Sequence, residues 1–265
     1  MPPAKKRARK YDPVKIRAAV LAQFGHVRQA VGTLTPEQLA RPTRLGDWTV
    51  RELAVHHTMA LGMLDRYLAE EEPLKQEAGL LDWPFRTAAV GDQVADGTRE
   101  LAASTADLDA LFEQRAARTE ELFAATADTR LMPTRFGAMT FADVLVTRTV
   151  ELVVHTDDLN DALPELGVPY DRQALAACTR LLADALAVKA PGGSVEVRIP
   201  PYAVVQCVAG PKHTRGTPPN VVETDPLTWI RLATGRTGWA EALDSAKVAA
   251  SGERADLSAV LPVMA

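Results

Sequence analysis

The sequence predicts an α region followed by an α+β region, that is, an N-terminal four-helix bundle and a smaller mixed domain. Up to Pro164 the apolar residues recur with helical periodicity, and no segment reads as a convincing strand. The stretch 163–169 contains two prolines and one glycine, which is typical of a linker. Beyond it, short strand-like runs alternate with helical segments. We therefore expect domains at 12–163 and 170–265.

Start signals define the first helices. Asp12-Pro13 combines an N-cap residue with proline at the first helical position, and it predicts a helix that ends near Val31. Thr35-Pro36-Glu37 repeats the signal for a short helix. Thr49 and Glu52 have the spacing of a capping box, in which the hydroxyl and the carboxylate satisfy free backbone N–H groups, so a helix should occupy about 50–70.

Two further long helices complete the predicted bundle. The Ala-rich segment at about 98–126 carries leucines and phenylalanines on one face and predicts the third helix. Thr140 marks the start of the fourth helix, which carries Glu151 and His155. Four long helices joined by irregular links indicate an antiparallel bundle, and the cores of such bundles are common sites for metal ions.

The second domain is predicted to mix helices and strands. A helix should run from residue 172 to about 188 and be followed by a Pro-Gly-Gly turn at 191–193. The further elements that we expect are strands at 195–199, 203–208 and 220–223, helices at 226–233 and 239–243, and an edge strand at 247–251.

Composition restricts the class of protein. The chain has 265 residues, of which 47% are hydrophobic, and this suffices for two cores. A net charge of -4 gives no reason to expect nucleic-acid binding. No apolar run is long enough to cross a bilayer or to form the core of a signal peptide, so we expect a cytoplasmic protein without a membrane partner. Cys178 and Cys207 lie far apart, as expected for reduced structural thiols.

The first residues are strongly basic. Lysines and arginines occupy five of the six positions 5–10. We expect residues 1–11 to form a disordered, solvated tail, because chain termini are often unstructured. A segment that binds RNA or anionic lipid, or a targeting signal, is the alternative interpretation.

Glu151 and His155 are four residues apart in a segment predicted to be helical. Residues with this spacing lie on one face, about 6 Å apart along the axis, so that a carboxylate and an imidazole converge on one point. That point could hold a metal ion. A Glu–His hydrogen bond or a solvated helix face is the structural alternative, and a third ligand would favour the metal.

The helix that begins at residue 50 offers the third ligand, because it contains His56 and His57. In a four-helix bundle a histidine at this place can face the helix of Glu151 and His155. Two histidines and a glutamate suit zinc or a similar divalent ion, with positions left for water or substrate. Adjacent helical residues point about 100° apart, so His56 and His57 cannot both face one metal equally well.

Two charged neighbours are further catalytic candidates. Asp158 follows His155 by about one turn and can orient that histidine, or it is an ordinary charge near the end of the helix. Arg148 precedes Glu151 by one turn. It can pair with a ligand carboxylate or with an anionic substrate, and a simple surface Glu–Arg pair is the alternative.

The runs GDWTVRELAVH at 46–56 and ELVVHTDDL at 151–159 together resemble the mycothiol-dependent maleylpyruvate isomerase family, within the DinB-like metal-binding bundle superfamily. In that family a histidine after the W-T-V-R-x-L motif and the Glu and His of E-x-x-x-H bind a divalent metal, usually zinc. The resemblance implies that His56, Glu151 and His155 are the metal ligands here. It favours His56 over His57 because of the distance from Trp48.

The second half resembles the bacterial sterol-carrier-protein-like domain that follows such bundles. The similarity lies in VEVRIPPY at 195–202, in the loop 210–223, and in DPLTW at 225–229, which leads to Gly235-Arg236 and Trp239. The loop contains Lys212, His213 and Arg215 and is stiffened by prolines. His213 and Arg215 are candidates for holding a carboxylate or phosphate near the metal, or their charges simply face water.

The resemblance implies a metal-dependent transferase or isomerase that uses mycothiol, a low-molecular-weight thiol, on a small electrophilic and anionic substrate. The metal would favour the thiolate of the bound thiol, and Arg148 or Arg215 would bind the substrate. The alternative is a non-enzymatic carrier whose second domain holds an apolar ligand while the metal is structural or vestigial. Metal-dependent hydrolysis, with Asp158 as general base, is a third possibility.

Overall fold

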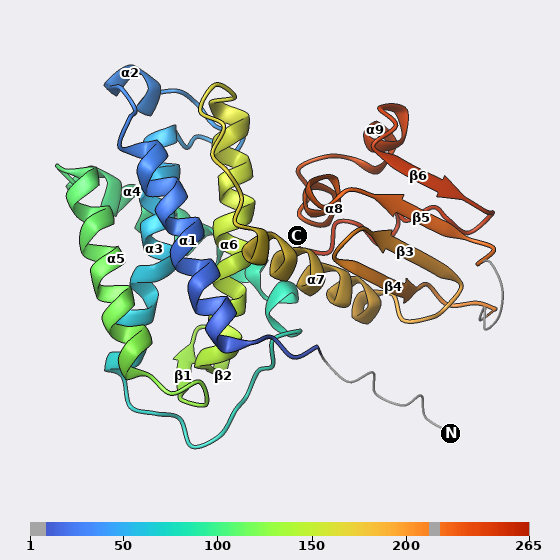
Figure 1. Ribbon diagram of the computed structural model, residues 1–265, viewed down its shortest axis with the longest axis horizontal. Coiled ribbons are helices and arrows are strands. Elements are labelled where there is room, and N and C mark those ends of the chain that lie inside the picture. Colours follow the sequence, from blue (N-terminus) through green and yellow to red (C-terminus); the bar gives the residue numbers. More distant parts are fainter. Residues whose placement is uncertain (1–8, 212–217, 265) are drawn as a thin grey trace.

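The computed structural model describes residues 9–211 and 218–264 and confirms the predicted α then α+β fold. Figure 1 shows a helical bundle on the left and a sheet on the right, with one helix running from the bundle along the sheet. The four long helices of the bundle are α1 (Pro13–Val31), α3 (Val50–Ala69), α5 (Leu108–Ala125) and α6 (Phe141–Ala162).

The predicted start signals form the caps of these helices. Asp12 accepts hydrogen bonds from the backbone N–H groups of Val14 and Lys15 at the start of α1. Thr49 and Glu52 form the capping box of α3, and Thr140 accepts from the backbone N–H of Asp143 in α6. Shorter helices lie between the long ones: α2 (Pro36–Leu39), η1 (Trp83–Phe85), η2 (Thr87–Val90) and α4 (Gly91–Ser104).

The prediction of one helix over 98–126 was wrong, because this segment contains the end of α4 and all of α5. The chain is extended at Thr105, and Asp107 caps α5 by accepting from the backbone N–H of Ala110. Arg51 of α3 donates to the carbonyl oxygens of Ala102 and Thr105, which holds the break in place. The break lets α4 pack on α3 beside the predicted metal ligands.

The prediction of no strand before Pro164 was also wrong. Strands β1 (Leu131–Thr134) and β2 (Gly137–Thr140) form an antiparallel hairpin in which Thr134 pairs with Gly137. Gly137 has a φ of +103°, a backbone conformation that residues other than glycine rarely adopt. The two residues of the hairpin turn, Arg135 and Phe136, reach a cavity described below.

The second part has the predicted elements in the predicted order. Helix α7 (Arg172–Lys189) leads into β3 (Val195–Ile199), β4 (Ala203–Cys207), β5 (Val221–Thr224), α8 (Pro226–Ala233), α9 (Trp239–Asp244) and β6 (Val248–Ser251). The sheet order is β4-β3-β5-β6, in which β3 and β5 are parallel and the other pairs are antiparallel. Strand β6 lies at an edge, as expected.

A continuous apolar core links the bundle to the sheet. Phe24 of α1, Leu182 of α7 and Trp229 of α8 all belong to one cluster of buried side chains. In β3 the residues Val195 and Val197 are buried while their neighbours are partly exposed, which is the alternation expected of a sheet with one covered face. Helix α7 contacts α1 and α6 as well as β4, so it joins the two parts.

Three further expectations concern the basic tail, the two cysteines and membrane-spanning segments. Residues 1–8 of the expected basic tail lie outside the described residues, while Arg9, in the same segment, donates to Asp184 of α7 at 2.8 Å. Cys178 and Cys207 are both buried. Within 9–211 and 218–264, no helix combines the length and the apolar character needed to cross a bilayer.

Candidate metal centre

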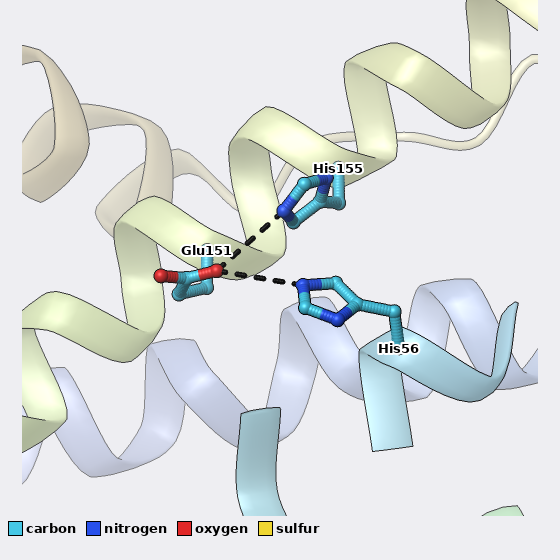
Figure 2. A group of neighbouring side chains, drawn as sticks. All are labelled: His56, Glu151 and His155. Carbon is cyan, nitrogen blue, oxygen red and sulfur yellow. Dashed lines mark ion pairs between the residues drawn. The ribbon is translucent and has the colours of Figure 1, made fainter. Parts of the chain in front are cut away.

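His56, Glu151 and His155 meet between α3 and α6. Figure 2 shows the two imidazole rings pointing toward the glutamate carboxylate. The Oε2 atom of Glu151 lies 3.7 Å from Nε2 of His56 and 3.5 Å from Nε2 of His155. One donor atom from each residue lies within 4.8 Å of the other two, so a single cation could bind all three. Two imidazoles and a carboxylate are a ligand set that zinc and related ions accept.

The remaining ring nitrogens are held by other side chains. Nδ1 of His155 lies 2.8 Å from Oδ2 of Asp158, and Nδ1 of His56 lies 3.4 Å from the hydroxyl of Thr98 on α4. The Thr98 hydroxyl donates to the carbonyl of Val94 at 2.7 Å, so its oxygen can accept from His56. When the two rings are neutral and each Nδ1 donates, each Nε2 keeps a lone pair toward Glu151. This arrangement is common among metal-binding histidines, and the residues fit a divalent cation. Burial by itself would lower the pKa of His155, but Asp158 and Glu151 outweigh burial and raise the pKa, so a cation would displace its Nε2 proton.

The charges in this cluster favour an ionised glutamate. Burial by itself would raise the pKa of Glu151, but the contacts with His155 and His56 and the charge of Arg148 outweigh it and lower the pKa well below its usual value. Burial and the nearby charge of His155 lower the pKa of His56. The carboxylate ligand is therefore anionic at neutral pH, as metal binding requires.

His57 lies outside the cluster. Its ring centroid is 6.2 Å from that of His155, compared with 4.5 Å for His56. The side chain is buried, and neither ring nitrogen has a hydrogen-bond partner among the described residues. Burial lowers the pKa of His57 to about 3. Of the two adjacent histidines, His56 is therefore the one that the structure brings to Glu151 and His155.

Asp158 connects the cluster to the second part of the chain. Arg236, just beyond α8, donates from Nη2 to Oδ2 of Asp158 at 2.8 Å, and Arg44 donates from Nε to Oδ1 at 2.7 Å. Burial raises the pKa of Asp158, but the bonds from His155 and Arg236 dominate and lower it well below its usual value. Asp158 therefore orients His155, which was one of its two predicted roles, and it is fully ionised.

The neighbouring Asp157 forms a second link of the same kind. Arg231 of α8 donates from Nη2 to its Oδ1 at 2.6 Å, Arg44 donates to Oδ2 at 2.6 Å, and the Tyr170 hydroxyl donates to Oδ1 at 3.0 Å. The sequence assigned no role at the site to Arg44, Arg231 or Arg236, although Arg236 lies in the motif of the second domain. The adjacent pair of aspartates near the end of a helix with many buried residues was a further signal.

A cavity of about 730 Å³ opens at the cluster. Its wall includes all three candidate ligands, together with Trp48 and apolar residues of α3, α4 and α6. Thr234, Arg236 and Met264 from the second part also line it. The candidate centre therefore faces a cleft that both parts of the chain enclose.

Arg148 is buried on the wall of this cavity, with 4% of its surface exposed, so the alternative of a surface Glu–Arg pair was wrong. Its Nη2 lies 3.9 Å from Oε1 of Glu151 and donates to the Thr147 hydroxyl at 2.9 Å. His213 and Arg215 lie outside the described residues, and their roles stay predictions from the sequence.

Both parts of the chain match known protein families. Residues 20–160 match the family described as mycothiol maleylpyruvate isomerase N-terminal domain, and residues 171–263 match the family described as bacterial SCP ortholog. No curated protein matches the chain.

Two solved structures share the fold. One is a mycothiol-dependent maleylpyruvate isomerase, with a TM-score of 0.58 and 17% sequence identity, over 93% of this chain and 95% of that one. The other is a mutant of such an isomerase in which a histidine is replaced by alanine, with a TM-score of 0.57, 17% identity and the same coverage. The family match over residues 20–160 covers more than half of the chain. The chain therefore belongs to the mycothiol maleylpyruvate isomerase N-terminal domain family.

Proposed function

We propose that this protein is a metal-dependent isomerase or transferase that uses a low-molecular-weight thiol, mycothiol, on a small electrophilic and anionic substrate. The observation that carries the proposal is the convergence of His56, Glu151 and His155 on the wall of a cavity. The family and the solved structures that share the fold support mycothiol as the thiol.

The proposed chemistry starts from a thiolate. A divalent cation held by His56, Glu151 and His155 would lower the pKa of a bound thiol and so supply the thiolate at neutral pH. The thiolate would add to a cis double bond conjugated to a carbonyl group of the substrate, forming a carbon–sulfur bond while the π electrons move onto the carbonyl oxygen as an enolate. Rotation about the resulting single bond, return of the electrons and expulsion of the thiolate would give the trans isomer. In a transferase the enolate carbon would instead take up the proton released by the thiol, and the adduct would leave.

The chain's own residues would position the reactants. Asp158 orients His155, and Arg148 offers a positive charge beside Glu151 for a substrate carboxylate. Asp158 is less suited to the role of general base in hydrolysis, because bonds from Arg236, Arg44 and His155 hold its pKa well below the usual value. Residues from both parts of the chain line the cavity together with the candidate ligands, which supports an enzyme over a carrier.

Metal content tests the proposal. Elemental analysis of the purified protein should find about one divalent ion per chain. His56→Ala and Glu151→Ala should lose nearly all of it, because each removes one of the three candidate ligands that the described part of the chain brings together. His57→Leu is the matched control, since His57 is adjacent and buried yet makes no hydrogen bond among the described residues. It should retain the metal. A His57 variant that loses metal while the His56 variant keeps it would contradict the assignment.

Turnover tests the reaction. The zinc-loaded protein should be incubated with mycothiol and a panel of electrophiles that includes cis-configured unsaturated acids. We expect thiol-dependent isomerisation or adduct formation that Glu151→Ala abolishes. Absence of turnover with every electrophile, in a protein that holds its metal, would favour the carrier.

A further inference from the structure

One face of α3 leads away from the candidate metal centre along the cavity wall. His56, Met59, Met63 and Arg66 follow each other at spacings of three and four residues, so they lie on one side of the helix, and all four line the cavity. At a rise of about 1.5 Å per residue, Arg66 lies about 15 Å along the helix from His56. Met59 and Met63 make this stretch of α3 apolar, and Arg148 of α6 donates to the Met63 sulfur.

Positive charges collect at the far end of this wall. Arg66 comes from α3, Arg115 from α5 and Arg135 from the turn between β1 and β2, and all three line the cavity. The backbone N–H of Arg135 donates to the Tyr67 hydroxyl at 3.3 Å, and the Arg66 guanidinium lies over the Tyr67 ring. Both arginines are therefore at the same level of α3.

These three arginines differ from the other cations of the cavity. Arg99 pairs with Asp47 at 2.8 Å, and Arg236 pairs with Asp158. Within the described part of the chain, Arg66, Arg115 and Arg135 form no ion pair with a carboxylate. Arg66 and Arg135 are exposed on the cavity wall and Arg115 is half-buried there, with its Nε packed against α3. Guanidinium groups that solvent can reach and that no described carboxylate neutralises are suited to an external anion.

The local structure makes room for this cluster. A Cβ at position 62 would lie only 3.0 Å from Cζ of Arg115, so Gly62 lets the guanidinium pack directly against α3. Arg148 lies between the cluster and Glu151, because its Nη2 is 3.9 Å from Oε1 of Glu151 and its Nη1 donates to the Met63 sulfur at 2.8 Å. Excess positive charge therefore extends from the hairpin turn toward the candidate metal centre.

We propose that Arg66, Arg115 and Arg135 form a subsite that binds the carboxylate of an electrophile with an extended apolar body. The inference rests on the proposed function and narrows its substrate class. A guanidinium group matches a carboxylate through two parallel hydrogen bonds. Met59 and Met63 would contact the apolar body, and its other end would lie toward His56, Glu151 and His155. A small dicarboxylate is too short to meet both ends of this wall.

Ligand binding to the zinc-loaded protein tests the subsite. Isothermal titration should compare 4-phenylbutyrate with its neutral amide, with maleate and with inorganic phosphate. We expect 4-phenylbutyrate to bind at least about tenfold more tightly than each of the other three, because it alone combines the charge with the apolar body. Equal affinity for phosphate or maleate would show a non-selective anion patch and overturn the proposal.

Matched variants locate the subsite. Arg66→Gln and Arg135→Gln should each weaken 4-phenylbutyrate binding about tenfold without changing the zinc content. Arg118→Gln is the control, because Arg118 lies on α5 one turn after Arg115 but does not line this cavity and is paired with Asp65 and Glu121. It should bind as the wild type does. Wild-type affinity in both subsite variants, or an equal loss in the control, would contradict the assignment.

A metal-free variant separates this inference from the proposed function. His56→Ala should still bind 4-phenylbutyrate within a few-fold of the wild-type affinity, because the arginines and not the metal hold the carboxylate. Loss of binding together with the metal would overturn the subsite and leave the metal-dependent function intact. A wild-type protein that binds 4-phenylbutyrate but takes up no divalent metal would overturn the metal-dependent function and leave the subsite intact.

Discussion

At the scale of single residues, the candidate centre depends on side chains that contact the Nδ1 atoms of its two histidines. The hydroxyl of Thr98 is fully buried, donates to the carbonyl of Val94 and lies 3.4 Å from Nδ1 of His56. Because the hydroxyl hydrogen is committed to Val94, the oxygen favours the tautomer of His56 that carries its proton on Nδ1. That tautomer presents the Nε2 lone pair to the position between Glu151 and His155.

Replacement of Thr98 tests this role. Thr98→Val keeps the shape of the side chain but removes the acceptor for His56, so we expect metal affinity to fall about tenfold. Thr98→Ser retains the hydroxyl and should bind metal nearly as the wild type does. The measurement is the dissociation constant for zinc by competition with a chromophoric chelator. Equal affinities in the valine and serine variants would show that Thr98 does not act through His56.

The sequence predicted part of this site. The spacing of Glu151 and His155 follows from helix geometry, so their common face could be predicted without a structure. The choice of His56 over His57 needed the family motif, because both lie on the same helix and both are buried. Arg236 and Thr98 reach the ligands through tertiary contacts across long sequence separations, and no local pattern predicts such contacts.

At the scale of helices and strands, the sequence signals that predicted the elements correctly are local ones. The N-cap residues Asp12, Asp171 and Asp225 accept backbone N–H groups within three residues, and the helices begin at residues 13, 172 and 226, where the sequence predicts them. The break between α4 and α5 is fixed partly by Arg51 of α3, and the β1–β2 hairpin receives the N–H groups of Glu77 and Ala78 at the carbonyl of Ala138. These contacts are tertiary, which explains why both features were missed.

The cap of α8 gives a prediction with a pH dependence. The Asp225 carboxylate accepts from the N–H groups of Leu227 and Thr228 and from the Thr228 hydroxyl. Burial raises its pKa, but these hydrogen bonds outweigh burial and lower the pKa below its usual value. Asp225→Ala should reduce the free energy of unfolding by about 1 kcal/mol at pH 7. Asp225→Asn, which keeps an acceptor oxygen, should lose less.

The sign of the pH effect follows from the lowered pKa. The ionised carboxylate is favoured in the folded state, so its contribution is complete above the unfolded pKa of about 3.9 and is lost as pH falls through the folded pKa. The difference between wild type and Asp225→Ala should therefore shrink in acid. Urea unfolding at pH 7 and at pH 3 measures it. A difference that grows in acid would contradict the assigned role of Asp225.

At the scale of the whole molecule, two buried aspartates join the bundle to the second part of the chain. Asp157 and Asp158 have at most 2% of their side chains exposed, and Arg231 and Arg236 reach them from α8 and the residues that follow. The linker composition and the strand pattern predicted two regions but could not predict how they pack. The same ion pairs that hold the regions together also orient His155, so the second region takes part in the candidate site.

Arg231 measures how strongly this interface stabilises the fold. Arg231→Met removes the hydrogen bonds of its Nε and Nη2 to Asp157 but keeps much of the apolar stem. A charged hydrogen bond to a buried group contributes about 1.5–3 kcal/mol, and Arg231 is 40% exposed, so solvent screening keeps the expected loss near the lower end, about 2 kcal/mol.

The matched control is an exposed arginine that also pairs with a carboxylate. Arg41 lies 2.7 Å from Glu165, and both side chains are about half exposed, so Arg41→Met should change the free energy of unfolding by less than about 1 kcal/mol. Urea titration of both variants, followed by tryptophan fluorescence, makes the comparison. Because Arg44 and Tyr170 still bond Asp157 in the Arg231 variant, the carboxylate should stay ionised and the fold intact. Equal stability of the two variants would show that Arg231 and Asp157 contribute no more than a surface pair, and the two regions would then be held together by the Arg236–Asp158 pair and the apolar core.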